Sequence, residues 1–236
     1  MASSLDPTYV VEKSCPLCDG VFPATKTRSK LRMVRQDTDF NIVYEQINPL
    51  YYSVWFCPHC GYAALESHFS DIPERSVQVL RDFLEGCQVS MDLPGVRSRE
   101  QAIILYKLAI FYSDLIDAKN SRLASLYLRL AWLYREAADE SLEMMALEKA
   151  LEYYEKASFK EGFPIGNMNE LTMDYLIAQL QFRTGKLDQA AANFSRIIAN
   201  PQAKSEKRIS ELARDAWADI KAKRKEAENE APAEQN

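Results

Sequence analysis

Two stretches in the first 70 residues have side-chain patterns typical of β-strands. Over 25–33, basic residues alternate with less polar ones, and this period of two indicates a strand with one basic face. A turn at Asn48 and Pro49 precedes a second, more apolar strand over 51–56. The basic residues of the first strand are Lys26, Arg28, Lys30 and Arg32.

From residue 71 the spacing of apolar residues becomes that of helices. Asp71 and Glu74 have the spacing of a capping box, and Pro73 is suited to a first helical turn. One face of this helix is apolar and includes Cys87, which we therefore expect to be buried. Further helices are predicted at about 99–116, 121–138, 140–158, 169–184, 187–199 and 205–228.

The predicted helices share a recurring arrangement of small and aromatic residues. A Leu-Ala-x-x-Tyr motif begins at Leu108 and recurs at Leu130. Further along, Gly185 lies seven residues after Ala178 and five before Ala190. This arrangement resembles a tetratricopeptide repeat, in which small residues allow paired helices to approach closely.

We therefore expect an α+β fold that is mostly α-helical. A small β-rich module resembling a zinc ribbon is expected over 1–70, followed by a tetratricopeptide-like antiparallel helical array over 71–228. A disordered tail is expected over 229–236. Because so short a β-rich module buries little apolar surface, it needs a metal ion or a neighbouring element for stability.

Two Cys-x-x-Cys pairs carry the clearest chemical pattern of the chain. Cys15 and Cys18 form the first pair, Cys57 and Cys60 form the second, and proline follows the first cysteine of each. Four thiolates bind zinc tetrahedrally and leave no open coordination position, so the pattern predicts a closed structural zinc site. The alternatives are a dithiol redox role, for which one pair would suffice, and a labile metal.

Composition limits the possible locations and partners of the protein. The chain has 236 residues, 47% of them hydrophobic, and a formal net charge of −5, which gives no overall attraction to nucleic acid. The N-terminal segment lacks the features of a secretory signal, and no apolar run is long enough to span a membrane. We expect a cytoplasmic protein whose reduced cysteines bind metal instead of forming disulfides.

The sequence resembles the bacterial domain-of-unknown-function family numbered 2225. The residues that carry this resemblance are the first cysteine pair, the segment 48–63 around the second pair, and three helical segments at 126–135, 147–157 and 183–196. The resemblance covers roughly residues 12 to 222. It implies four cysteine ligands and a tetratricopeptide-like C-terminal half, and it implies no activity.

These observations favour a non-enzymatic scaffold or adaptor that binds a peptide or partner protein through helical repeats. The sequence contains no phosphate-binding glycine loop, nucleophile elbow or helical His-Glu-x-x-His motif. One alternative is a regulator that binds RNA or DNA through the basic strand, although such residues also commonly protect an exposed strand edge. A second alternative is a thiol redox or metal-handling protein.

Overall fold

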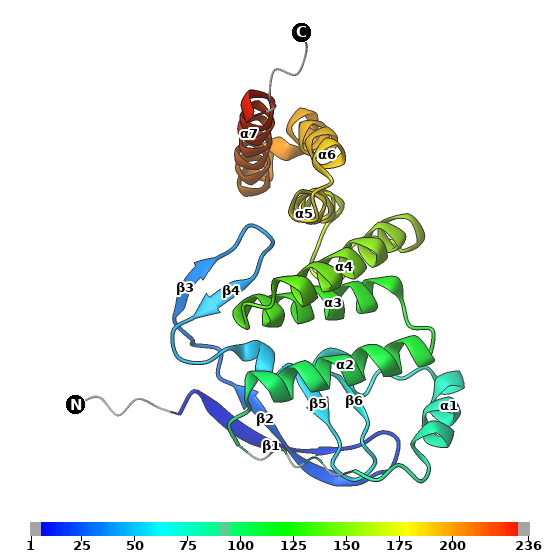
Figure 1. The fold of residues 1–236 in the computed structure, drawn as a ribbon. Coiled ribbons are helices and arrows are strands. Elements are labelled where there is room, and N and C mark those ends of the chain that lie inside the picture. Colours follow the sequence, from blue (N-terminus) through cyan, green and yellow to red (C-terminus); the bar gives the residue numbers. More distant parts are fainter. Residues whose placement is uncertain (1–5, 90, 92, 94, 231–236) are drawn as a thin grey trace, which may run out of the picture. The chain divides into compact units, whose positions relative to one another are not determined.

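The structure, a computed structural model, describes residues 6–230 except 90, 92 and 94, with side chains described up to residue 225. This part of the chain forms seven α-helices and three two-stranded antiparallel sheets, an α+β fold that is mostly α-helical, as predicted (Figure 1). The chain divides into two compact units, 1–146 and 147–236. None of the described helices is both long and apolar enough to cross a lipid bilayer.

The first unit contains all of the described strands, paired as consecutive hairpins. Each hairpin pairs two strands that are adjacent in sequence, so no hairpin shares a strand with another. The pairs are β1 (Thr8–Ser14) with β2 (Val21–Thr27), β3 (Met33–Gln36) with β4 (Ile42–Tyr44), and β5 (Val54–Phe56) with β6 (Ala63–Leu65).

The predicted basic strand over 25–33 is wrong in its extent, because β2 ends at Thr27. In the register of the first hairpin, Thr27 lies opposite Thr8, the first residue of β1. The ladder continues by one hydrogen bond, from the N–H of Arg28 to the carbonyl of Pro7 at 2.8 Å, and stops there because proline has no N–H to return a bond. Residues 28–32 therefore form a connection to β3, and the basic residues do not share one strand face.

The strand predicted over 51–56 is shorter in the structure, because a 3-10 helix occupies its beginning. The side chain of Asn48 accepts a hydrogen bond from the backbone N–H of Leu50 at 3.0 Å and caps this helix (Pro49–Tyr52). Pro49 occupies its first turn, where its missing N–H costs little. The strand β5 then begins at Val54.

The core of the first unit lies between β5, β6 and the helix α2 (Arg99–Leu115), which packs on both strands. A second helix, α3 (Asn120–Glu136), packs against α2. Phe69 lies at the centre of an aromatic cluster, with ring centroids at 5.6 Å from Phe22, 5.7 Å from Trp55 and 5.1 Å from Tyr62. Burial of these large rings contributes a large apolar contact area to the core.

The first helix, α1 (Glu74–Leu84), differs from its prediction at both ends. Asp71 does not cap it, since Pro73 is the N-cap residue and makes no side-chain capping bond. The helix ends at Leu84, and Gly86 adopts a positive φ of 78°, which breaks the helical path. Cys87 therefore lies beyond the helix and is exposed, so the prediction that it is buried is wrong.

The boundary predicted between residues 70 and 71 falls inside the first unit. The strands β5 and β6 precede this point and α2 follows it, and these elements bury one another. The predicted tail over 229–236 lies outside the described residues except for Asn229 and Glu230, which end the last helix.

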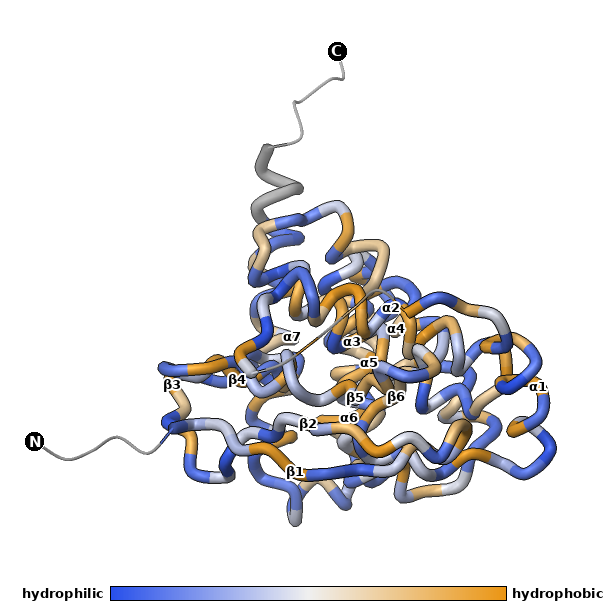
Figure 2. Tube along the Cα trace, turned by 90° about the horizontal axis from the view of Figure 1, so that it is seen from below, coloured by the Kyte–Doolittle hydropathy of each residue, from blue (hydrophilic) through white to orange (hydrophobic). Residues whose placement is uncertain are grey.

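The second unit is built from helices joined by short connections. Helix α4 (Glu140–Lys160) begins in the first unit and ends in the second, and α5 (Glu170–Arg183), α6 (Leu187–Ala199) and α7 (Lys207–Glu230) follow. Helix α6 packs against both α5 and α7. The helices predicted from residue 99 onward are confirmed to within two residues at each end. Both hydrophobic and hydrophilic residues occur along the chain, as the colouring in Figure 2 shows.

Small residues set the approach of α5 to α6. Ala178 and Ala190 are fully buried, and the rings of Tyr175 and Phe194 pack at 5.9 Å. Gly185 adopts a positive φ of 77° in the turn between the helices, a conformation that glycine adopts without strain.

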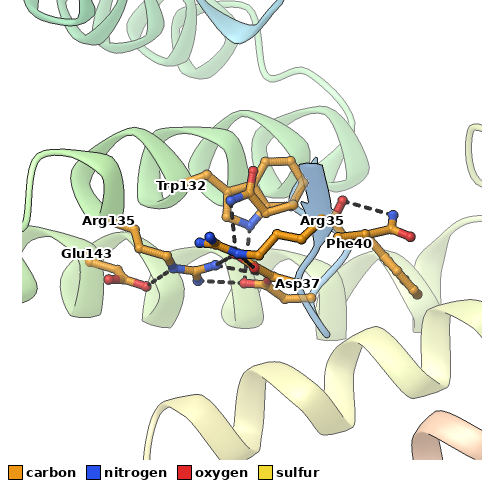
Figure 3. Close-up of polar contacts among 9 residues, drawn as sticks. Arg35, Asp37, Phe40, Trp132, Arg135 and Glu143 are labelled. Atoms are coloured by element: carbon orange, nitrogen blue, oxygen red, sulfur yellow. Dashed lines mark hydrogen bonds and ion pairs between the residues drawn. The ribbon is translucent and has the colours of Figure 1, made fainter. Parts of the chain in front are cut away.

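A network around Arg135 attaches the β3–β4 hairpin to α3 (Figure 3). The guanidinium donates to both carboxylate oxygens of Asp39, at 3.2 and 2.6 Å, and to Asp37 at 3.1 Å. Its Nε donates to Glu143 at 2.7 Å, and Trp132 Nε1 donates to Asp39 at 3.2 Å. Asp39 is fully buried, so its charge depends on these donors.

Asp37 extends this network into the hairpin itself. Burial alone would raise the pKa of Asp37. Hydrogen bonds from Arg35, Asn41 and Arg135, each at 3.1 Å, outweigh burial and leave the pKa of this carboxyl below its ordinary value. The ionised carboxylate is therefore the form that holds the hairpin turn on α3.

Replacing Arg135 by methionine should lower the free energy of unfolding of the first unit by about 3 kcal/mol, because the charge of Asp39 would stay buried without its main partner. Urea unfolding followed by tryptophan fluorescence measures this change. Arg32→Met is the matched control, since Arg32 and its partner Glu45 are both exposed and the pair should contribute less than about 1 kcal/mol. Equal losses in the two variants would contradict this account.

Candidate metal centre

The two cysteine pairs lie in loops with the same backbone pattern. Cys15 and Cys18 lie between β1 and β2, and Cys57 and Cys60 lie between β5 and β6. In each loop the N–H of the first cysteine donates to the carbonyl five residues later, at 3.0 and 2.8 Å. Its carbonyl accepts from the N–H four residues later, at 3.0 and 2.9 Å. The loop residue that donates this second bond has a positive φ, 58° at Asp19 and 83° at Gly61.

These loops bring the four sulfur atoms together. All four Sγ atoms lie within 4.8 Å of one another, and the Cys15–Cys60 and Cys18–Cys57 separations are both 3.6 Å. Tetrahedral coordination with metal–sulfur bonds of about 2.3 Å requires sulfur separations of roughly 3.8 Å. The cluster is therefore compatible with a metal site that is closed by four protein ligands.

The protonation of these thiols depends on their mutual proximity. A hydrogen bond from Cys60 lowers the pKa of the Cys15 thiol to about 5, while burial raises the pKa of Cys57 to about 11. Without a cation, four negative sulfurs so close together would repel one another strongly. A metal ion removes this conflict, because it favours the thiolate form of every ligand.

His59 connects the two loops without joining the cysteine cluster. Its Nε2 lies 2.9 Å from the carbonyl oxygen of Val21 at the start of β2. The ring also lies against Gly20, where an added Cβ would approach the His59 Cδ2 to 2.4 Å. A side chain at position 20 would therefore displace the His59 ring from this contact, a constraint that the sequence pattern did not reveal.

Two helices hold the loops from outside. Arg81 of α1 donates through Nε to the carbonyl of Leu17 at 2.9 Å, and the hydroxyl of Tyr112 of α2 donates to the carbonyl of Gly61 at 3.1 Å. Sequence reasoning missed both residues. Each contact joins positions more than 50 residues apart, so no local spacing indicates it.

The structure places three of the four predicted basic residues around one groove. Lys26, Arg28 and Lys30 line a groove of about 770 Å³ together with Tyr9 and Tyr44. None of the described residues that line it is acidic, although Lys26 is paired with a glutamate just outside at 2.5 Å. Arg32, the fourth residue, does not line this groove. It pairs instead with Glu45 at 3.2 Å.

The chain belongs to a bacterial protein family described as "Uncharacterized protein conserved in bacteria (DUF2225)", whose profile matches residues 9–220. The resemblance inferred from the sequence is thereby confirmed, and the matched region includes all four clustered cysteines. No curated protein and no solved structure matches the chain.

If the four clustered thiols hold a metal ion, they should resist alkylation until a strong chelator removes it. Cys18 and Cys87 are both exposed, so accessibility alone would make them react alike. With N-ethylmaleimide and mass spectrometry, we expect rapid labelling of Cys87 alone in the untreated protein and of all five cysteines after chelation. Cys87→Ser should show no rapid labelling. Rapid labelling of Cys18 in the untreated protein would contradict metal binding.

Proposed function

We propose that this protein is a non-enzymatic cytoplasmic scaffold, in which a structural zinc ion stabilises the first unit and the helices of the second unit bind a peptide or partner protein. The donor set supports zinc, since four soft thiolates within 4.8 Å of one another are the ligands typical of zinc or iron–sulfur sites. In a reducing cytoplasm the thiols stay available as ligands, and the binding free energy of a closed zinc site, on the order of 10–16 kcal/mol, becomes folding free energy. It leaves no coordination position for a substrate.

The helices of the second unit support the binding role. The pairing of α5 with α6 through buried alanines and a glycine turn resembles a tetratricopeptide-like repeat. A groove of about 810 Å³ lies among α4, α5 and α6, and this groove is the observation that carries the proposal. Preformed helices bind an extended segment without an ordering cost on the scaffold side.

A second candidate function, binding of RNA or DNA, is favoured by the groove around Lys26, Arg28 and Lys30. Cations next to Tyr9 and Tyr44 could neutralise phosphates while the rings stack on bases. The guanidinium of Arg28 already lies 5.6 Å from the Tyr9 ring centroid, which shows that charge and ring share this wall. A thiol redox role has no comparable support, because the sulfur separations fit shared coordination of one ion.

A groove variant should lose partner proteins that the wild-type protein captures from a bacterial lysate. Phe159 is a suitable position, since it lines the groove and is 89% exposed, so Phe159→Ser should not affect folding. Met145→Ser is the matched control, because Met145 is an exposed apolar residue of the same helix outside the groove lining. Quantitative mass spectrometry should find the same partners with Met145→Ser and a loss with Phe159→Ser. Identical partner sets for both variants would contradict the scaffold proposal.

If the basic groove binds nucleic acid, Arg28→Gln/Lys30→Gln should weaken binding of a fluorescein-labelled oligouridine about tenfold at low salt. The slope of log affinity against log salt should fall by roughly 2, because two phosphate contacts are lost. Lys204→Gln/Lys207→Gln removes two exposed cations of the second unit and serves as the control. Absence of any anisotropy change with the wild-type protein at about 50 mM salt would exclude this candidate.

A further inference from the structure

The groove of the second unit combines exposed aromatic rings with a polar floor. Its walls come from the C-terminal part of α4, from α5 and from the end of α6. Phe159 is 89% exposed and Phe163 is 37% exposed, and both line the groove. Rings exposed to this extent within a groove are characteristic of binding sites for apolar groups.

The charges that line the groove are mainly negative. Glu155, Glu170 and Asp174 face one cationic residue, Arg196, so the described lining carries a net charge of −2. Arg196 lies 3.6 Å from Asp174, and its side chain is largely exposed, so this pair is weak. The groove therefore offers unneutralised negative charge to a ligand.

Asp174 is a half-buried carboxylate between Arg196 and Glu170. Burial raises its pKa; Arg196 opposes this effect, and repulsion from Glu170 adds to it. Glu170 and Asp174 are four positions apart on α5 and therefore lie on the same face of the helix. An additional cation between these two carboxylates would relieve their mutual repulsion and would add to the weak pairing of Asp174 with Arg196.

Glu155 is held in place by a chain of amide hydrogen bonds that crosses three helices. Gln181 donates through Nε2 to Glu155 at 3.0 Å and accepts from Asn193 Nδ2 at 2.7 Å. Gln181 is almost fully buried, so the network is fixed before any ligand arrives. Fixed donors and acceptors of this kind reduce the ordering cost of binding.

We propose that this groove binds an extended peptide segment in which a lysine or arginine lies next to a large apolar residue. This inference rests on the function proposed above and names the class of partner. The cationic side chain contacts the carboxylates of Glu170 and Asp174, and the apolar side chain packs on Phe159 and Phe163. The three carboxylates that line the groove would repel an acidic segment, so the proposal excludes acidic peptides.

Fluorescence anisotropy with labelled octapeptide pools tests this preference on the full-length protein. The pools are degenerate except for two central residues, which are fixed as Arg-Leu, Glu-Leu or Arg-Ser. We expect the Arg-Leu pool to bind about tenfold more tightly than either of the others, because each of these lacks one of the two contacts. Phe159→Ser should abolish the advantage of Arg-Leu over Arg-Ser.

The variant Glu170→Gln/Asp174→Asn should abolish the advantage of Arg-Leu over Glu-Leu. Glu211→Gln is the control, because Glu211 is an exposed carboxylate of α7 outside the groove lining. Equal affinities for Arg-Leu and Glu-Leu, with binding still sensitive to Phe159→Ser, would overturn the proposed selectivity and leave the scaffold function intact. Failure of every pool to bind would overturn this inference, and the lysate capture would then decide the scaffold function separately.

A second copy of the chain is the main competing occupant, because α7 carries the exposed and mostly basic run 221–225. Sedimentation velocity over a range of concentrations distinguishes it from a peptide. The proposal predicts no self-association that depends on Glu170 and Asp174. A dimer that Glu170→Gln/Asp174→Asn dissociates would contradict the proposal and would identify a second copy as the occupant.

Discussion

The first unit depends on four sulfur atoms that must meet although their loops are far apart in sequence. Cys18 and Cys57 are 39 positions apart, and their Sγ atoms lie 3.6 Å from each other. The three hairpins of this unit form separate two-stranded sheets, and isolated hairpins are marginally stable in water. A shared ion would join the loop of the β1–β2 hairpin to that of the β5–β6 hairpin, on which α2 packs. With such an ion bound, loops, helices and core would form one cooperative structure.

The two units have different physical sources of order, and this difference fits different roles. The cysteine loops are tied together and to the helices: His59 joins them, and Arg81 and Tyr112 hold them from α1 and α2. The second unit is ordered by close helix packing at Ala178 and Ala190, which needs no ion. Its groove keeps exposed rings and unneutralised carboxylates, features that cost stability unless a ligand uses them. We therefore propose that the cysteine cluster stabilises the first unit and that the groove recognises a partner.

The sequence revealed those features that have a local signature. Helix positions from residue 99 onward follow from apolar spacing, and the cysteine cluster follows from two short motifs. The end of β2 was mispredicted because it depends on where β1 begins, and the exposure of Cys87 because Gly86 ends the helical path. The contact of Arg135 with Asp39 joins positions 96 residues apart, so only the folded chain shows it. The groove of the second unit is likewise lined by residues of three helices, so no local pattern indicates it.

Metal analysis of the purified protein, combined with circular dichroism, tests the central claim most directly. The account predicts about one zinc ion per chain in the wild-type protein and in Cys87→Ser, whose altered thiol lies outside the cluster. Cys57→Ser should lose the ion and much of the ordered structure of the first unit, because a closed site cannot keep its geometry with three thiolates. Full zinc content and an unchanged spectrum in Cys57→Ser would contradict the account.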